Sequence, residues 1–442
     1  MAAATRVRAA GGTTGRSGPA GPEPRPDSPT PPAGSGAVLP RPAAGPGASL
    51  LRQLVLVEVA AAVVLVGWAV GRAVLVPAAV LAVLLVLLAV LRRGHRPVVD
   101  WLTTGLALRR RVRRAAEPAA PGTHPGLAPV VECEPALRTE AFAARERRVV
   151  GLVGDGTFLT AVLRIEVVDA PLRAHRTEKP LPLALLRDAM DVDGIRLESV
   201  QVVQSTLPSP APHLPAQALA ARSYAPLQAL TGSPAVRLTW VALKFDPELC
   251  PEAVAARGGG AEGARRCVLR AADQLASRLH GAGFRAAVLS EEELTAAIAT
   301  AASVNPMATA QAGRTGTAAR RTAETARAWR CDDRWHSTYW VGRWPRLGPG
   351  ATPLPQLAAL LTSLPAPATT LSLTLGRGRM RGGRHAPTMT GHVRITGRSA
   401  DELTAVGREM ERAARAVKVG LVRLDREQVP GVLATLPLGG TR

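Results

Sequence analysis

Two pairs of aspartates come closest to a catalytic arrangement in this sequence. Asp332 and Asp333 are adjacent, and an acidic pair of this type can hold a divalent metal ion in enzymes that transfer sugars from nucleotide donors. No element that could cradle a nucleotide accompanies the pair, so catalysis there is not favoured. The other pair, Asp191 and Asp193, lies beside Gly194, where aspartate is favoured by the backbone geometry of a turn.

The other candidate sites each lack a necessary part. A glycine run between Arg257 and Arg265 leads into a predicted helix, whose start would attract anions, but Glu262 stands where a phosphate would bind and the P-loop Lys-Ser/Thr is missing. The eight histidines form no His-Glu-x-x-His motif, and no Gly-x-Ser-x-Gly elbow is present. We therefore expect no catalytic residue, no metal ion and no cofactor. The four cysteines form no Cys-x-x-Cys pair and are expected to be buried or incidental thiols: Cys133, Cys250, Cys267 and Cys331.

Aromatic side chains crowd into one segment, although only 3% of the chain is aromatic. Trp335, Tyr339, Trp340 and Trp344 lie there among several arginines. Rings beside arginines can stack nucleic-acid bases, anchor a protein interface or fill a core. We favour core packing or a partner interface over nucleic acid, because the positive charge is not concentrated on one predicted helix of the body.

Composition excludes several classes of protein. The net charge of +21 comes almost entirely from arginine, which is typical of a GC-rich genome and says little about chemistry. Four cysteines in 442 residues exclude a disulfide-stapled secreted domain. A hydrophobic fraction of 47% excludes a wholly disordered chain, yet the chain is not apolar enough for a transporter with many spans. The composition therefore predicts a soluble body with a small membrane part and a disordered tail.

The N-terminal region predicts that tail and that membrane part. Residues 1–48 are rich in Pro, Ala and Gly and cannot bury enough surface to order themselves. The apolar block that follows is too long for one helix across a hydrocarbon core of about 30 Å. We predict two transmembrane helices at 51–70 and 73–91, with a tight turn at Arg72 and with Pro77 in the first turns of the second helix.

The charges around this pair predict its orientation. Arg92, Arg93 and Arg96 follow the second helix, so the positive-inside rule places both termini of this plasma-membrane protein in the cytoplasm. The basic linker 92–136 is expected to lie against anionic lipid headgroups. Glu58, an acid inside the apolar block, is expected to face a partner or to reach the membrane surface.

The rest of the sequence contains the same pattern twice. We predict an α+β body with a first subdomain at 137–303, a linker at 304–328 and a second subdomain at 329–442. Both subdomains have the order β-α-β-β-α-β, which is typical of a ferredoxin-like split βαβ unit. The predicted elements of the first are 157–168, 183–190, 196–207, 235–245, 262–280 and 284–289, and those of the second are 337–344, 355–364, 369–375, 388–396, 401–417 and 419–424. Capping boxes begin two helices, one of them a further helix to about residue 302: Ser290 with Glu293, and Ser399 with Glu402.

Several motifs taken together resemble the EccE family, whose members are membrane-complex components of actinobacterial type VII (ESX) secretion systems. Besides the tail and the two-helix hairpin, the resemblance rests on four segments: Val150–Thr157, Arg257–Gly260, Tyr339–Pro345 and Ala434–Gly440. It implies a subunit at the periphery of a hexamer-building inner-membrane machine that also contains EccB, EccD and the ATPase EccC. The family has no established catalytic residues, and its cytosolic domain has an outward similarity to glycosyltransferase folds.

Three functions follow from these observations. The first is a non-enzymatic accessory or scaffold subunit that supports assembly and the export of small WxG-type proteins. The second is a membrane-tethered glycosyltransferase-like enzyme that uses Asp332 and Asp333. The third is a membrane-bound regulator that binds nucleic acid through its charge. The lack of a complete nucleotide or metal motif favours the first over the second.

Overall fold

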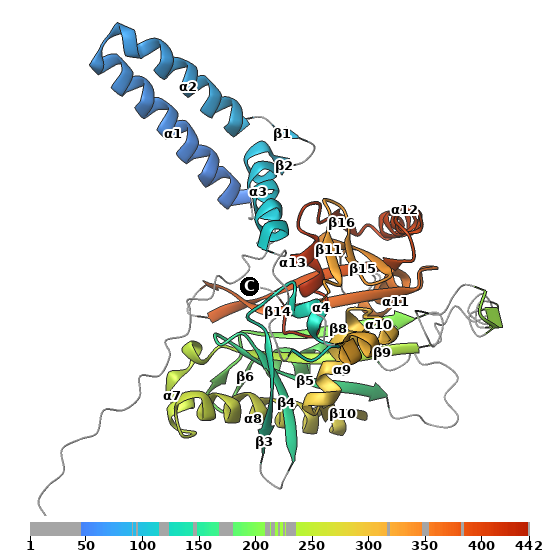
Figure 1. The fold of residues 1–442 in the computed structure, drawn as a ribbon. Helices are drawn as coiled ribbons and strands as arrows, with labels where there is room; N and C mark the ends of the chain where they lie inside the picture. Colours follow the sequence, from blue (N-terminus) through green and yellow to red (C-terminus); the bar gives the residue numbers. More distant parts are fainter. Residues whose placement is uncertain are drawn as a thin grey trace, which may run out of the picture. The chain divides into compact units, whose positions relative to one another are not determined.

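The structure is a computed structural model, and its described residues carry one large sheet (Figure 1). The tail predicted for residues 1–48 lies outside the described residues up to residue 45. The described residues are 46–90, 92–93, 96–114, 123–144, 148–167, 180–207, 213, 217–219, 222–223, 226, 236–315, 319–346, 353–381 and 384–440.

Twelve strands form this sheet, and every pairing within it is antiparallel. Ten of them follow one path, β11-β12-β13-β15-β14-β8-β9-β5-β4-β3, while β10 pairs with β5 and β16 pairs with β13. Their bounds in chain order are β3 Arg138–Ala143, β4 Val149–Gly154, β5 Leu159–Val167, β8 Ser199–Leu207, β9 Val236–Phe245, β10 Phe284–Val288, β11 Thr322–Glu324, β12 Trp329–Cys331, β13 Arg334–Arg343, β14 Ala368–Arg381, β15 Arg384–Gly397 and β16 Gly420–Arg423.

The sheet has two halves that meet where β8 pairs with β14. In the first half the strands lie in the order β10-β5-β9-β8, and in the second in the order β16-β13-β15-β14. A hairpin precedes each half, β3–β4 before β5 and β11–β12 before β13. The junction runs from the pair Ser199 and Gly376 to the pair Thr206 and Thr369, so its backbone groups are bonded along its whole length.

The two predicted β-α-β-β-α-β passes did not include their joining into one sheet, which the structure shows through β8 and β14. The individual strands and helices lie close to their predicted ranges, but the strands form one continuous sheet. Alone, each half would present β8 or β14 as an unpaired edge with a row of free N–H and C=O groups. Pairing the two edges satisfies those groups, and a hydrophobic pattern within a strand carries no information about which edge pairs with which.

The predicted transmembrane hairpin is also corrected. α1 (Pro46–Val70) and α2 (Arg72–Val90) contact each other and are separated at Gly71, so two helices with a tight turn are present. Among the described residues, however, none of the helices combines the length and apolar content that a membrane crossing requires.

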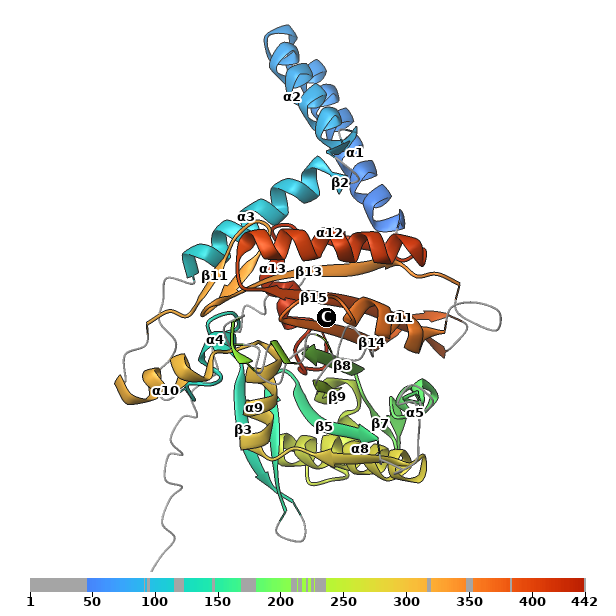
Figure 2. The same cartoon turned by 90° about the vertical axis from the view of Figure 1, so that its right-hand side faces the viewer.

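Helices cover both faces of the sheet. On one face, α8 packs on β5 and β9, while α11 packs on β14 and α12 on β15 and β13 (Figure 2). On the other face, α9 and α13 belong to a core that includes Trp240 and Trp329.

The helices of the body are α4 Ala128–Val131, α5 Leu183–Asp188, α7 Pro251–Ala255, α8 Gly260–Gly281, α9 Glu291–Ala301, α10 Pro306–Thr315, α11 Leu354–Thr362, α12 Ala400–Ala416 and α13 Gln428–Leu433. The smaller elements and the helix before the body are β1 Arg92–Arg93, β2 Arg96–Pro97, α3 Val98–Arg114, β6 Asp191–Val192, β7 Ile195–Arg196 and the 3-10 turn Pro247–Leu249.

Local sequence signals explain where two of these helices begin. Ser290 and Glu293 form the predicted capping box of α9, with the amide of Glu293 donating to Ser290 Oγ over 3.3 Å and the amide of Ser290 donating to Glu293 Oε2 over 3.0 Å. Ser399 accepts from the amide of Glu402 over 3.1 Å at the start of α12. Each side chain satisfies a backbone N–H that has no partner within its helix.

The segment from Ala434 to Gly440 is buried across the junction of the two halves. Gln201 of β8 donates from Nε2 to the carbonyl of Ala434 over 2.9 Å, and its Oε1 accepts from the amide of Gly439 over 2.9 Å. Thr160 Oγ1 donates to the carbonyl of Leu438 over 3.0 Å. Gly440 has a φ of +81°, and a Cβ there would lie 2.6 Å from the side chain of Thr374. A glycine is therefore required for this close approach.

Candidate functional site

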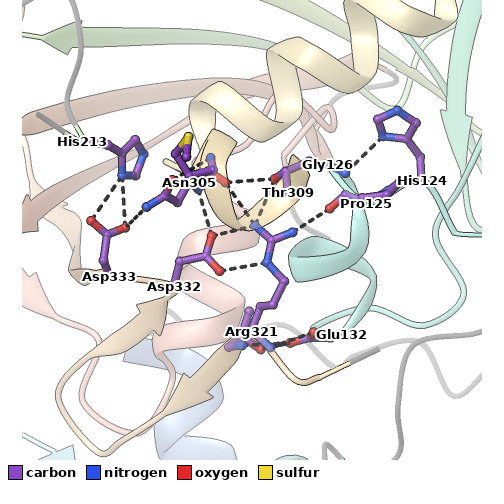
Figure 3. Close-up of polar contacts among 12 residues, drawn as sticks. His124, Pro125, Gly126, Glu132, His213, Asn305, Thr309, Arg321, Asp332 and Asp333 are labelled. Carbon is purple, nitrogen blue, oxygen red and sulfur yellow. Dashed lines mark hydrogen bonds and ion pairs between the residues drawn. The ribbon is translucent and has the colours of Figure 1, made fainter. Parts of the chain in front are cut away.

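Asp332 and Asp333 form the two-residue turn between β12 and β13. The hairpin is closed by the pairing of Cys331 with Arg334, and Asp332 has a φ of +50°. Aspartate tolerates this left-handed conformation better than most residues. The turn places Asp332 close to the residues before β11 and places Asp333 at the surface, where its side chain is 41% exposed (Figure 3).

Arg321 occupies both oxygens of Asp332. Its Nε donates to Oδ1 over 2.8 Å and its Nη2 to Oδ2 over 2.7 Å, which is the bidentate geometry of a strong ion pair (Figure 3). The two side chains are only 9% and 6% exposed. Arg321 Nη1 also donates to the carbonyl of Pro125 over 2.7 Å, and the amide of Asn305 donates to Asp332 Oδ2 over 2.8 Å. Asp332 therefore has little acceptor capacity left for a metal ion or a substrate.

Asp333 is held by a second set of partners. Asn305 donates from Nδ2 to its Oδ1 over 3.0 Å, Arg334 Nη1 lies 3.0 Å from its Oδ2, and His213 Nδ1 lies 3.1 Å from its Oδ1 (Figure 3). Burial lowers the pKa of His213, although the negative charge of Asp333 acts in the opposite direction. These contacts connect the turn to α10 and to the segment after β8.

Glu132 completes the network from the N-terminal side of the body. Its carboxylate accepts from the amide of Arg321 over 3.0 Å, from the amide of Thr322 over 2.9 Å and from Thr322 Oγ1 over 2.7 Å. Burial opposes the charge on Arg321, but its hydrogen bonds to Asp332 raise the pKa of the guanidinium. The network thus fastens the segment around α4, the start of α10 and the β12–β13 turn to one another.

The arrangement is suited to holding segments together rather than to transferring a group. A general base or metal ligand needs an accessible oxygen, whereas both oxygens of Asp332 are bonded to Arg321. Among the residues that the structure describes, no group of three His, Cys, Asp or Glu side chains could hold a metal ion. The geometry therefore gives no support to the glycosyltransferase interpretation of the pair.

The other charged candidates are likewise paired. Arg265 forms two bonds with Glu140 of 2.8 and 2.7 Å, and Arg266 donates to Glu262 over 2.8 Å at the start of α8. Asp193 accepts from Arg270 Nε over 2.9 Å in the β6–β7 hairpin. The glycine run is thus the start of a helix whose neighbouring arginines contact carboxylates.

Burial favours the protonated thiol at Cys133 and Cys331. Burial raises the pKa of Cys133 to about 12, and burial raises the pKa of Cys331 as well. A thiol that stays protonated is a poor nucleophile and a poor metal ligand.

The aromatic segment divides between the two faces of β13. Tyr339 is buried, and Trp335 and Trp344 pack against the core beneath α11 and α12. Trp340 is partly exposed on the opposite face of the strand, outside the cores formed by the described residues. Of the four predicted interface residues, Trp340 is therefore the best placed to contact a partner.

The residues that were predicted to set the topology lie in α1, α2, β1 and β2. Glu58 in α1 and Pro77 in α2 are exposed. The side chains of four arginines lie outside the described residues: Arg72, Arg92, Arg93 and Arg96. Farther along, Arg111 of α3 donates from Nε to Glu324 Oε2 over 2.9 Å, so this basic helix is bonded to β11.

Sequence reasoning missed the residues that organise the network. Arg321 lies in the segment 304–328, which was predicted to be a linker, and nothing in its neighbourhood marks it as buried. Its partners Glu132 and Asn305 are distant in sequence from the β12–β13 turn. The adjacent aspartates Asp332 and Asp333 were the only sign of this network in the sequence, and they suggested a catalytic site rather than an ion pair.

Acid is expected to destabilise the folded chain through buried histidines. Burial lowers the pKa of His392 to about 4 and lowers the pKa of His336 well below its usual value near 6.5. At a pH between the lowered pKa of the folded state and the usual pKa near 6.5, the unfolded chain binds more protons than the folded chain. The free energy of unfolding therefore falls as the pH falls, by up to about 1.4 kcal/mol per pH unit for each histidine. His392→Gln should flatten this slope in urea titrations between pH 6.5 and pH 4. Equal slopes in the wild type and in His392→Gln would contradict the assignment.

Comparison with known families identifies one match. Residues 233–341 match the family model EccE, described as a putative type VII ESX secretion system translocon. The matched residues run from β9 into β13 and include Arg321, Asp332 and Asp333. No curated protein matches the chain. The resemblance to EccE is therefore confirmed over these residues.

Proposed function

We propose that this EccE-like chain is a non-enzymatic accessory subunit that holds part of a type VII secretion complex together and so supports the export of small WxG-type proteins. The match over residues 233–341 is the observation that carries the proposal. The network of Arg321 supports it, because the carboxylates that could have served catalysis instead fasten segments of the body.

A scaffold must be rigid and must present a surface. Rigidity is favoured by the continuous sheet and by the ion pairs between distant segments. For the surface we propose the end of the Trp340 face of β13, where Trp340 is partly exposed and Arg343 is exposed, since a large ring beside arginines is typical of interface anchors. The partners proposed for this face are the other membrane-complex subunits EccB, EccC and EccD.

A second contact is proposed for α3. Arg111 is bonded to Glu324, whereas Arg109, Arg110, Arg113 and Arg114 are exposed on the same helix. Clustered exposed arginines attract anionic lipid headgroups, and each contributes about 1 kcal/mol near such a surface. We expect no role for nucleic acid.

The test of the interface uses two tryptophans of the same segment. Trp340→Ala should weaken association with the other subunits by about 2 kcal/mol or more, while the melting temperature stays near that of the wild type. Trp344→Ala is the control, because its ring packs against the core and over Gly391, so its loss should cost about 3–5 kcal/mol of folding stability.

The readouts are co-purification of the subunits, native-gel assembly of the complex and secretion of WxG-type proteins in a gene deletion complemented with each variant. If Trp340→Ala lowers co-purification only in step with unfolding, the interface proposal fails. If deletion of the gene leaves both assembly and export unchanged, the scaffold proposal fails as a whole.

A further inference from the structure

A row of buried polar side chains crosses the sheet on the face that carries α9 and α13. Thr338 of β13 pairs with Arg394 of β15, Arg394 pairs with Thr370 of β14, and Thr370 pairs with Ser205 of β8. All four side chains belong to residues that are at most 2% exposed. The strand register therefore places a guanidinium in the interior of the body, among hydroxyl groups.

Arg394 is bonded there only to groups without a full negative charge. Its Nη2 donates to the carbonyl of Ala301, at the C-terminal end of α9, and to Thr370 Oγ1 over 3.3 Å. Its Nε and Nη1 have no hydrogen-bond partner among the described residues. Burial lowers the pKa of the guanidinium to about 10, so it still carries its charge at neutral pH. A buried charge is stable only when an opposite charge lies close to it.

His336 supplies a further unpartnered nitrogen beside this charge. It is fully buried, and it pairs with Thr396, which lies two residues beyond Arg394 on β15. Residues in this diagonal relation share a face and are within reach of a long side chain. His336 Nδ1 lies 3.0 Å from Thr396 Oγ1, whereas its Nε2 has no partner in this part of the structure. When the hydroxyl donates to Nδ1, Nε2 carries the proton and needs an acceptor.

The surroundings of these donors are closely packed. α13 approaches β13 so closely that a Cβ at Gly431 would lie 2.9 Å from Thr338 Cβ. On the neighbouring side, the ring of Trp329 lies against His336, with 5.0 Å between the two ring centroids. Packing of this kind suits a single atom better than a polyatomic group such as a phosphate ester.

We propose that Arg394 and His336 bind one small monatomic anion of the halide class. The anion accepts hydrogen bonds from Nε and Nη1 of Arg394 and from Nε2 of His336, and its charge neutralises the guanidinium. A water molecule would accept the same bonds but would leave that charge without a counterion. The site is separate from the network of Arg321 and from the surface proposed at Trp340, and it does not rest on the proposed function.

The experiment is urea denaturation of the full chain at constant ionic strength, with sodium gluconate replaced stepwise by sodium chloride. Urea is required because guanidinium chloride would add the anion under test. A ligand that binds only the folded chain raises its stability, so chloride at about ten times its dissociation constant should raise the urea midpoint by about 0.3–0.5 M. Arg394→Met should abolish this rise, whatever its own stability. His336→Phe keeps a ring beside Trp329 and should show less than half of the rise.

An exposed arginine provides the control for general screening of the positive charge. The side chain of Arg285 is 71% exposed, so Arg285→Met should show the same rise in chloride as the wild type. Equal midpoints of the wild type in chloride and in gluconate would overturn the proposal. A rise of wild-type size in Arg394→Met, or loss of the rise in Arg285→Met, would overturn it as well. None of these results bears on subunit association, so the proposed function is judged separately.

Discussion

Replacing Arg321 by methionine is expected to lower the free energy of unfolding by about 3–5 kcal/mol. The change leaves the carboxylate of Asp332, whose side chain is 6% exposed, without the guanidinium that neutralises it. A charge buried without a partner is far more costly than the loss of the pair as a whole. Urea denaturation of the full chain measures the difference directly.

Matched variants separate this effect from a general loss of arginine. Arg148→Met removes an ion pair with Asp273 whose side chains are 48% and 43% exposed, and it should cost no more than about 1 kcal/mol. Asp332→Asn keeps a residue that tolerates the turn, and in combination with Arg321→Met it should recover part of the loss. A single variant Arg321→Met as stable as Arg148→Met would show that the network does not fasten these segments.

Removal of the last residues of the chain is expected to have an effect of similar or larger size. A chain that ends at Thr435 loses Leu436 and Leu438, which are 0% and 7% exposed, together with Gly439, whose amide donates to Gln201 Oε1. Large buried apolar side chains contribute about 2–5 kcal/mol each, so the sum approaches the whole stability of an ordinary domain. We expect this chain to accumulate in insoluble form or to melt far below the full chain.

The control for the truncation ends at Gly440. It removes only Thr441 and Arg442, which lie outside the described residues, and it should melt like the full chain. Equal solubility and melting of the chain that ends at Thr435 would mean that the sheet junction does not depend on the C-terminal segment.

Local elements were predictable because their signals are local. The capping box of Ser290 fixed the start of α9, and alternation of apolar residues located β5, β8, β9 and β15 close to their observed ranges. β3, β11 and β12 were not among the predicted strands. The transmembrane prediction relied on the same apolar content, and it is not supported within the described residues.

Long-range pairing was not predictable from one sequence. Nothing in the residues of β8 or β14 states that these two edges meet, and Arg321 looks like any exposed arginine of a linker. The role of Asp332 and Asp333 could not be predicted either. It depends on contacts with Asn305 and Arg321, which only the fold brings close to the turn. For the aromatic segment, the face that each ring occupies follows from the register of β13, which the sequence does not state.

The antiparallel pairing of β8 with β14 relates the two halves by an approximate two-fold rotation, because β10, β5 and β9 correspond in order to β16, β13 and β15. This is how two copies of a subunit join edge to edge in a symmetric homodimer. In this chain the connection between the halves replaces the encounter of two molecules, so the pairing does not depend on protein concentration. The two halves have different sequences, so only one of them needed to acquire the network of Arg321. In a dimer of identical subunits, both copies would carry the same residues.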